Sequence, residues 1–172
     1  MKKKAEGMQP FREFYPLVRD ILRSREFRGM KRYRHHVKGN LYDHSVKVAY
    51  LCFLHRKRFA PQKEIAPLVR GAILHDFYLY ELHGEAKTHK WHWFRHPSVA
   101  LKNAVERYPD LSFAERDMIK HHMFPLTLVP PLTWDGWLVW WYDMVASFHD
   151  RFGKRRPRTA RKDTKKAVGA LP

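Results

Sequence analysis

The sequence lacks the features that mark several common classes of protein. It has one cysteine, Cys52, so it can form no internal disulfide, and this residue lies in an apolar helical pattern where we expect a packed, unreactive thiol. There is no paired-cysteine zinc spacing, no glycine-rich phosphate loop and no serine nucleophile elbow. No apolar run is long enough to cross a bilayer, and there is no internal repeat. These absences exclude a disulfide framework, a thiolate zinc centre and a membrane span.

Length and composition predict one cytoplasmic domain with anionic partners. The 172 residues suit a single domain, and 44% hydrophobic residues argue against global disorder. Lys2, Lys3 and Lys4 are followed by Glu6 rather than by an apolar segment, so we expect no secretory signal. The net charge of +17 exceeds what solubility requires, and it indicates nucleotides, nucleic acid or a membrane surface as partners.

Apolar residues recur at helical spacing, which predicts an all-α domain over residues 11–153. Residues 1–10 are expected to form a flexible tail, and residues 154–172 a disordered basic tail. Four helices follow from the periodicity alone, over residues 11–22, 43–59, 63–77 and 134–152.

Local signals mark two further helices and two irregular segments. Pro97, directly after His96, predicts one helix start, and Ser112 with Glu115 predicts a capping box at the next. The basic residues 23–38 form either a solvated face or loop, or one wall of a phosphate-binding surface. Residues 78–95 gather aromatic and imidazole groups without periodicity, and these could stack on a base or sugar or simply pack on the surface.

Two carboxylates stand where free charge would be costly. The helix over residues 63–77 ends on His75 and Asp76, and a desolvated carboxylate needs a cation or several donors to compensate it. Either Asp76 is solvated at a plain helix end, or the pair holds a metal ion. Asp143 stands in the middle of the last helix and also needs a partner. The apolar residues around it predict burial of that helix on several sides: Trp137, Leu138, Trp140, Trp141, Met144, Val145 and Phe148.

Imidazoles and carboxylates at such positions form an inventory of metal ligands. Nitrogen and oxygen donors without thiolates favour iron, manganese, magnesium or cobalt. Asp76 has two oxygens and could bridge two divalent ions about 3.5 to 4 Å apart. The six residues that we expect to bind the metal ions are His44, His75, Asp76, His96, His122 and Asp143.

Three short motifs follow one another at these positions. They are Asp43-His44-Ser45-Val46-Lys47-Val48-Ala49, Val69-Arg70-Gly71-Ala72-Ile73-Leu74-His75-Asp76 and Tyr142-Asp143-Met144-Val145. In this order, on predicted helices, they resemble the HD superfamily of metal-dependent phosphohydrolases over about residues 41–148. The resemblance implies a helical bundle with the metals between its helices. His96 and His122 resemble the second-metal ligands of binuclear members, including bacterial dinucleoside-polyphosphate hydrolases.

The sequence departs from that family in two places. Many members have a lysine soon after the His-Asp pair, where this chain has Phe77-Tyr78-Leu79-Tyr80. The Gly-Tyr-Pro signature of the cyclic-dinucleotide branch is absent from Met123-Phe124-Pro125-Leu126, which disfavours cyclic dinucleotides as substrates. Between His121 and His122 we favour His122 as the ligand, because the family's single histidine precedes the same kind of loop.

The resemblance implies hydrolysis of a phosphate ester or anhydride, with a nucleotide as the expected substrate. A water molecule activated by one or two cations at Asp76 would attack phosphorus in line. Lys47 and Arg70 are candidates to neutralise developing charge, although either could be an ordinary solvated cation. His121 or a loop histidine such as His83 could donate a proton to the leaving group.

Two other functions fit the same residues. One is a nucleic-acid-binding or scaffold protein with a structural or vestigial metal site, whose basic tails contact RNA or DNA. The other is an HD-type nuclease, which would combine a metal centre with nucleic-acid binding. The sequence does not predict an oligomeric state.

Overall fold

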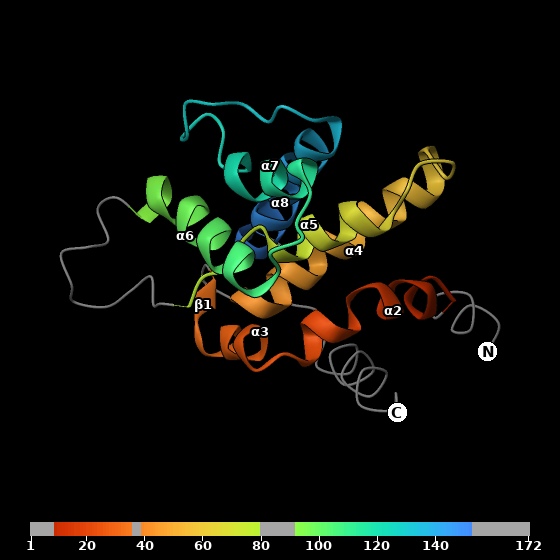
Figure 1. Cartoon of the computed structure of the whole chain (residues 1–172), viewed down its shortest axis with the longest axis horizontal. Helices are drawn as coiled ribbons and strands as arrows, with labels where there is room; N and C mark the ends of the chain where they lie inside the picture. Colours follow the sequence, from red (N-terminus) through yellow and green to blue (C-terminus); the bar gives the residue numbers. More distant parts are fainter. Residues whose placement is uncertain (1–8, 36–38, 80–91, 153–172) are drawn as a thin grey trace.

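Helices make up most of the structure, which confirms the all-α prediction. The computed structural model describes residues 9–35, 39–79 and 92–152. Its seven described α-helices are α2 (Gln9–Arg23), α3 (Arg25–Gly29), α4 (Leu41–Phe59), α5 (Ala66–Leu74), α6 (His92–Arg107), α7 (Phe113–His121) and α8 (Trp134–Phe152) (Figure 1). Between α3 and α4 the chain forms the 3-10 turn η1 (Met30–Arg32) and a short antiparallel pair of strands, β1 (Arg34–His35) and β2 (Gly39–Asn40).

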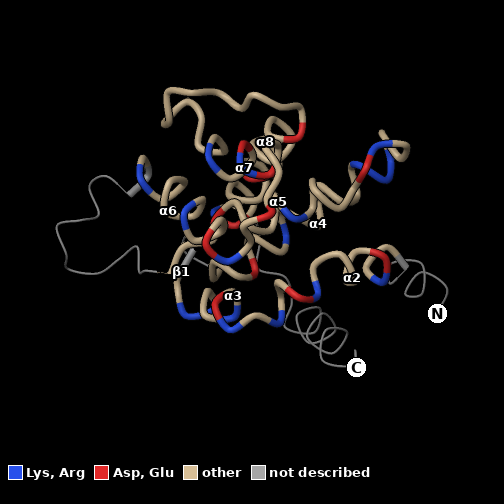
Figure 2. The backbone as a smooth tube through the Cα atoms, viewed as in Figure 1, with Lys and Arg blue, Asp and Glu red and all other residues tan. Residues whose placement is uncertain are grey.

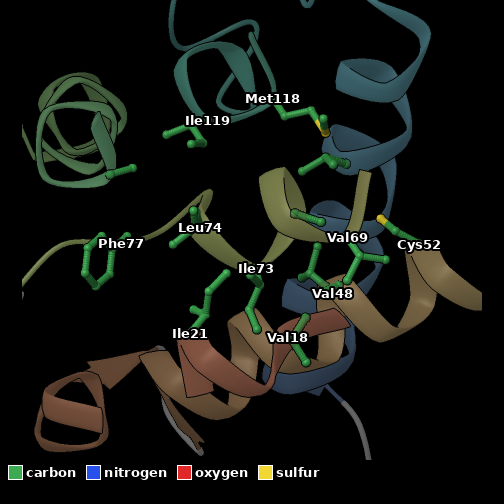
Figure 3. Packing of buried hydrophobic residues seen from close by; sticks show 14 of the residues in the cluster. Val18, Ile21, Val48, Cys52, Val69, Ile73, Leu74, Phe77, Met118 and Ile119 are labelled. Carbon is green, nitrogen blue, oxygen red and sulfur yellow. The ribbon is translucent and has the colours of Figure 1, made fainter. Parts of the chain in front are cut away.

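The short helix α5 lies at the centre of the fold (Figure 1). Six of its nine residues are buried. It packs against α4 and α7 and also contacts α2 and α6. Figure 3 shows Val69 and Ile73 of α5 close to Val18 of α2 and Val48 of α4. Apart from Arg70 the helix is apolar, and such a segment is stable only when neighbouring helices cover it.

Gly71 allows α7 to lie very close to α5. A Cβ atom at this position would lie 2.7 Å from the Cε of Met118 and 3.3 Å from the Cα of Glu115. Met118 is fully buried, so its side chain has little room to move away. The close approach brings the ends of the two helices together, and the rings of His75 and His122 lie 4.9 Å apart there.

α4 and α5 have bounds that differ from the predicted ones. α4 begins at Leu41 because the side chain of Asn40 caps it, accepting a hydrogen bond of 2.8 Å from the backbone N–H of Asp43. α5 is shorter than predicted and ends at Leu74. Asp76 therefore lies just beyond the helix end, where it is buried rather than solvated.

The predicted start of α6 is wrong, whereas the predicted start of α7 is confirmed. α6 begins at His92, so Pro97 lies inside the helix and His96 is not at its mouth. Pro97 is the sixth residue of α6, beyond the first four whose N–H groups lack intrahelical partners, so the helix gives up one backbone hydrogen bond there. The capping box of α7 is confirmed. Ser112 N–H donates to the Glu115 carboxylate over 2.7 Å, and Glu115 N–H donates to the Ser112 hydroxyl over 3.3 Å.

The basic segment before α4 is more ordered than a loop. It folds into α3 and η1, because Phe27 and Met30 are buried and the hydroxyl of Ser24 accepts a hydrogen bond from Phe27 N–H. Its cations stay on the surface, where Figure 2 shows them around α3. The exposed basic residues of this segment are Arg23, Arg25, Arg28, Lys31 and Arg32.

The prediction that α8 is buried on several sides is wrong. The helix packs against α4 and α7 with one side, which buries Gly136, Val139, Asp143 and Ala146. The opposite side meets little of the described chain, although the ring of Phe124, in the loop before α8, contacts Trp137 there. Seven large apolar residues are therefore exposed there: Trp134, Trp137, Trp141, Met144, Val145, Phe148 and Phe152.

Some predicted features lie outside the described residues. These are residues 1–8 and 153–172 of the predicted tails, and residues 80–91 of the aromatic segment, including His83. Residues 9 and 10 of the predicted N-terminal tail belong to α2. Among the helices that the structure describes, none combines the length and the apolar character that crossing a membrane requires.

A buried carboxylate fixes the chain at the start of α8. Asp117 accepts hydrogen bonds from Leu132 N–H over 3.0 Å, Thr133 N–H over 2.9 Å and the Thr133 hydroxyl over 2.6 Å. Nδ1 of His121 donates to it as well, over 2.7 Å. Burial raises the pKa of Asp117, but these hydrogen bonds lower it more, so the group stays ionised. One side chain thus holds the position from which α8 carries Asp143 into the core.

Replacing Asp117 by alanine should destabilise the protein strongly. The substitution leaves several buried donors without an acceptor, and we expect a loss of roughly 2–4 kcal/mol in the free energy of unfolding, measured by urea titration. Asp110→Ala is the matched control, because Asp110 is exposed and pairs with Arg70 at the surface. Equal losses in the two variants would contradict a special role for Asp117.

Candidate metal centre

Five helices bring the six expected ligands to one place. α4 carries His44 in its first turn, α5 ends next to His75 and Asp76, α6 carries His96, α7 ends next to His122, and α8 carries Asp143. All six side chains are buried, with relative exposures between 0% and 8%, and isolated charge is costly in such surroundings. The six residues are His44, His75, Asp76, His96, His122 and Asp143.

The six side chains form overlapping groups around Asp76. On one side, Nε2 of His44 lies 2.9 Å from Oδ1 of Asp143, and Nε2 of His75 lies 3.5 Å from Oδ2 of Asp76. Nε2 of His75 is also 3.8 Å from Oδ1 of Asp143. Three combinations of these and the remaining ligands have their donor atoms within 4.8 Å of one another: His44 with His75 and Asp76, His75 with His122 and Asp143, and Asp76 with His96 and His122.

The second oxygen of Asp76 faces a different pair of histidines. Its Oδ1 lies 3.3 Å from Nε2 of His96 and 3.4 Å from Nε2 of His122. Those two nitrogen atoms are 3.0 Å apart. Because Oδ2 faces His75 and Oδ1 faces the other two imidazoles, the carboxylate has the orientation of a bridge between two neighbouring sites.

Backbone carbonyl groups orient two of the imidazole rings. Nδ1 of His75 donates to the carbonyl of Ala72 over 2.8 Å, and Nδ1 of His122 donates to the carbonyl of Ile119 over 2.9 Å. A carbonyl can only accept, so the proton of each neutral ring is on Nδ1 and the lone pair of Nε2 points into the cluster. Histidines that bind metal ions are commonly oriented in this way.

Two observations fit the cluster to a divalent cation. Nε2 of His75 is buried and makes no hydrogen bond within the described part of the chain. Its lone pair is therefore available to a metal ion. Ligand atoms that bind one cation at about 2.1 Å and at right angles lie about 3.0 Å apart. The separations of 2.9 Å in the His44–Asp143 pair and 3.0 Å in the His96–His122 pair match this geometry. These buried groups could therefore hold a metal ion.

The two carboxylates of the cluster remain ionised despite their burial. Burial raises the pKa of Asp76, but the charge of His75 and the hydrogen bonds from His122 and His96 lower it well below its usual value. For Asp143, the hydrogen bond from His44 and the charges of neighbouring histidines likewise outweigh burial and lower the pKa. The cluster thus carries two negative charges that favour a cation.

The pKa values of the histidines shift in different directions. Burial lowers the pKa of His44, but hydrogen bonds to its two aspartate partners more than offset this and raise it to about 9. The pKa of His75 is raised in the same way, because the charge of Asp76 outweighs burial. For His122 burial dominates and the pKa is lowered. A cation that binds His44 or His75 has to displace a proton, so metal affinity should increase with pH.

The structure adds Asp150, which was not among the predicted site residues. Its Oδ2 accepts a hydrogen bond of 3.3 Å from Nδ1 of His44. Its Oδ1 pairs with Lys47 over 2.8 Å. Burial raises the pKa of Asp150, but these two partners lower it to about 2. Asp150 follows Asp143 by seven residues, or two helical turns, and this spacing was the only signal in the sequence that could have revealed it.

The three other predicted catalytic residues lie outside the cluster. Lys47 reaches it only through Asp150. Arg70 forms two hydrogen bonds, of 2.6 and 2.8 Å, with the exposed carboxylate of Asp110. His121 donates to Asp117, the carboxylate that fixes the chain at the start of α8, while the neighbouring His122 lies in the cluster.

Comparison with known proteins adds no family assignment. A scan of protein-family models, a search of curated proteins and a search of solved structures each found no match for the chain. The chemistry of the site is therefore inferred from its residues and their geometry.

Without metal, the protein should lose stability as pH rises towards 9. A group whose pKa is higher in the folded state stabilises that state fully below its unfolded pKa of about 6.5, and loses this effect as pH passes the folded value. For His44, whose pKa is raised to about 9, the loss is on the order of 3 kcal/mol, since one unit corresponds to about 1.4 kcal/mol. The raised pKa of His75 acts in the same direction.

The measurement is urea unfolding of chelator-treated protein at pH of about 6 and about 9.5. His44→Gln should reduce the slope between these two pH values. A stability that stays constant or increases over the range would contradict the shifted pKa of His44.

Asp150→Asn should weaken metal binding without removing a ligand. Partners that orient a metal-binding histidine typically contribute 10- to 100-fold in affinity, and we expect a loss in this range for Mn²⁺ measured by calorimetry. Asp20→Asn is the control, because the Asp20 side chain is 88% exposed and lies on α2. An unchanged affinity in the Asp150 variant would show that this carboxylate does not position His44.

Proposed function

We propose that the protein is a metal-dependent phosphohydrolase of the HD superfamily that holds two divalent cations. The orientation of Asp76 supports this most directly, since its two oxygens face separate imidazoles. His44, His75 and Asp143 would complete the first site together with Asp76. His96 and His122 would complete the second site. The donor set of nitrogen and oxygen atoms suits iron, manganese, magnesium or cobalt.

Divalent cations in such a centre lower the pKa of a water molecule and polarise the oxygens of a phosphoryl group. The protein's own residues supply the framework for that chemistry. Asp76 and Asp143 stay ionised and provide the negative charge. Hydrogen bonds at Nδ1 hold the rings of His44, His75 and His122. Because the framework is preformed and buried, little rearrangement is needed when a phosphate compound binds.

The proposed substrate is a nucleotide or another small phosphate compound. The net charge of +17 attracts anions, and exposed cations gather on α3 and η1 (Figure 2). Lys47 is retained as a candidate for neutralising negative charge, because Asp150 contacts both Lys47 and His44. We assign no catalytic role to Arg70 or His121, since Asp110 and Asp117 hold them elsewhere.

The charge also supports a second candidate, an HD-type nuclease. A basic protein binds polymeric phosphate strongly at low salt, and the same metal centre could cleave a phosphodiester. The two candidates differ in the substrate that is cleaved fastest. Mononucleotides and dinucleotides would be preferred by the first, and single- or double-stranded nucleic acid by the second.

Asp76→Asn should abolish hydrolysis while preserving the fold. The variant keeps the size of the side chain but removes the shared charge, and we expect kcat/KM to fall at least roughly 1000-fold. Activity on a chromogenic phosphate ester, a nucleotide panel and oligonucleotides should be measured with added Mn²⁺, with metal content determined by elemental analysis. Circular dichroism checks that the variant is folded.

Asp110→Asn is the matched control, because it removes an equivalent charge from an exposed position. It should retain full activity. Hydrolysis that is independent of added metal and persists in Asp76→Asn would contradict the proposal. Unchanged nucleic-acid binding by Asp76→Asn, with no hydrolysis by either protein, would favour a binding protein instead.

A further inference from the structure

The exposed side of α8 forms a continuous apolar stripe. We call it the outer stripe, and it consists of Trp134, Trp137, Trp141, Met144, Val145, Phe148 and Phe152. Successive members are one to four residues apart, so all seven lie within about 100° of the helix circumference. The buried residues Gly136, Val139, Asp143 and Ala146 lie on the opposite side. α8 is thus apolar towards the core and also apolar towards the solvent.

The outer stripe is large enough for a stable interface. Trp134 is 83% exposed, Phe148 67% and Trp141 55%. From the sizes of such side chains, the stripe exposes on the order of 900 Å². The largest apolar patch of a typical monomer is about 300–600 Å², while a stable interface buries about 800 Å² on each partner. Trp, Phe and Met are also the residues enriched at the centres of protein interfaces.

Basic residues are missing from this part of the chain. Residues 121–150 contain no Lys or Arg, although the whole chain has 34. Figure 2 shows the loop that leads into α8 free of charged residues up to its end. A surface for nucleic acid or anionic lipid would need cations along its length, whereas the one Lys or Arg of α8 is Arg151, which lies over the ring of Phe152 at the end of the stripe. The segments outside the described residues are mostly polar and basic, so they are poorly suited to cover the stripe.

We propose that the outer stripe binds the same stripe of a second copy of this chain. Two molecules of net charge +17 repel each other, and they can approach closely only where cations are absent. The spacing of Trp134, Trp137, Trp141, Met144 and Phe148 alternates between three and four residues, which is the spacing of helices that pair along a seam. The stripe is therefore complementary to itself in both composition and position.

The charges at the two ends of α8 favour an antiparallel arrangement of the two α8 helices. Asp135 lies in the first turn, while Arg151 lies in the last turn and the basic residues 154–156 follow it in the sequence. A parallel pair would bring two basic ends together. In an antiparallel pair these ends are separated by the length of the 19-residue helix, about 28 Å, which is several times the screening length of about 8 Å at physiological salt.

The arrangement links the dimer to the candidate metal centre without depending on its function. The inner side of α8 carries Asp143 and Asp150, which contact the two ring nitrogens of His44. A partner on the outer side would hold the helix from both directions. The interface would nevertheless form equally well in a protein with no hydrolase activity.

Sedimentation velocity of the full chain tests the proposal. After nuclease treatment, at about 50 μM protein and in about 0.5 M NaCl, contacts through nucleic acid are screened and an apolar interface persists. We expect a dimer. Phe148→Glu places one charge per copy in the interface and should raise the dimer Kd by roughly 100-fold or more. Phe113→Glu is the matched control, because Phe113 is equally exposed, at 67%, but lies on α7.

Cross-linking tests the orientation of the two helices. Met144 lies near the middle of α8, so in an antiparallel pair Met144→Cys meets its own copy and should cross-link efficiently with a short bismaleimide. Trp134→Cys lies at one end, about 28 Å from its copy, and should not cross-link. The native Cys52 is fully buried and leaves the introduced thiols as the reactive ones among the described residues.

Several results would overturn the proposal. A wild-type monomer at the stated concentration would exclude the second copy, and binding of that monomer to vesicles of anionic lipid would assign the stripe to a membrane instead. Equal dissociation by Phe113→Glu and Phe148→Glu would show that the interface lies elsewhere. Efficient cross-linking of Trp134→Cys would exclude the antiparallel arrangement. Because Phe148 is exposed, circular dichroism should show the variant folded, so loss of the dimer reports on the interface.

Discussion

The burial of Asp76 among imidazoles is the constraint on which the rest of the structure depends. A carboxylate in the interior is costly unless positive groups surround it, and here those groups come from several helices. α5 supplies the position, Gly71 lets α7 approach, and Asp117 fixes where α8 begins. The helices are thus arranged so that separate segments of the chain balance one buried charge. A divalent cation would satisfy the same requirement.

Much of the fold and the candidate ligand set could be predicted from the sequence. Periodicity identifies long helices because each has one core-facing side, and the capping box of Ser112 and Glu115 depends on neighbours three residues apart. The six candidate ligands could be chosen because charged and imidazole groups in apolar surroundings are unusual. Such arguments use only local sequence, and they succeed where local sequence determines the structure.

The features that were missed depend on how helices are placed relative to one another. Periodicity shows that α8 is apolar but not which of its sides meets a neighbour, so the exposure of Trp134 could not be predicted. Asp150 becomes recognisable only when its helix turns it towards His44. Phe27 anchors α3 within a basic segment, where one apolar residue gives no periodic signal. Each error arises where tertiary packing decides between local alternatives.

The spread of the ligands along the chain has a consequence for biosynthesis. His44 and Asp143 are separated by 99 positions, and α8 is the last described helix. A nascent polypeptide that has emerged from the ribosome only as far as His122 already contains Asp76 and the four candidate ligand histidines but still lacks the carboxylate that pairs with His44. The full set of candidate ligands is assembled only after α8 has left the exit tunnel, so a cation that needs Asp143 can be bound only after that point.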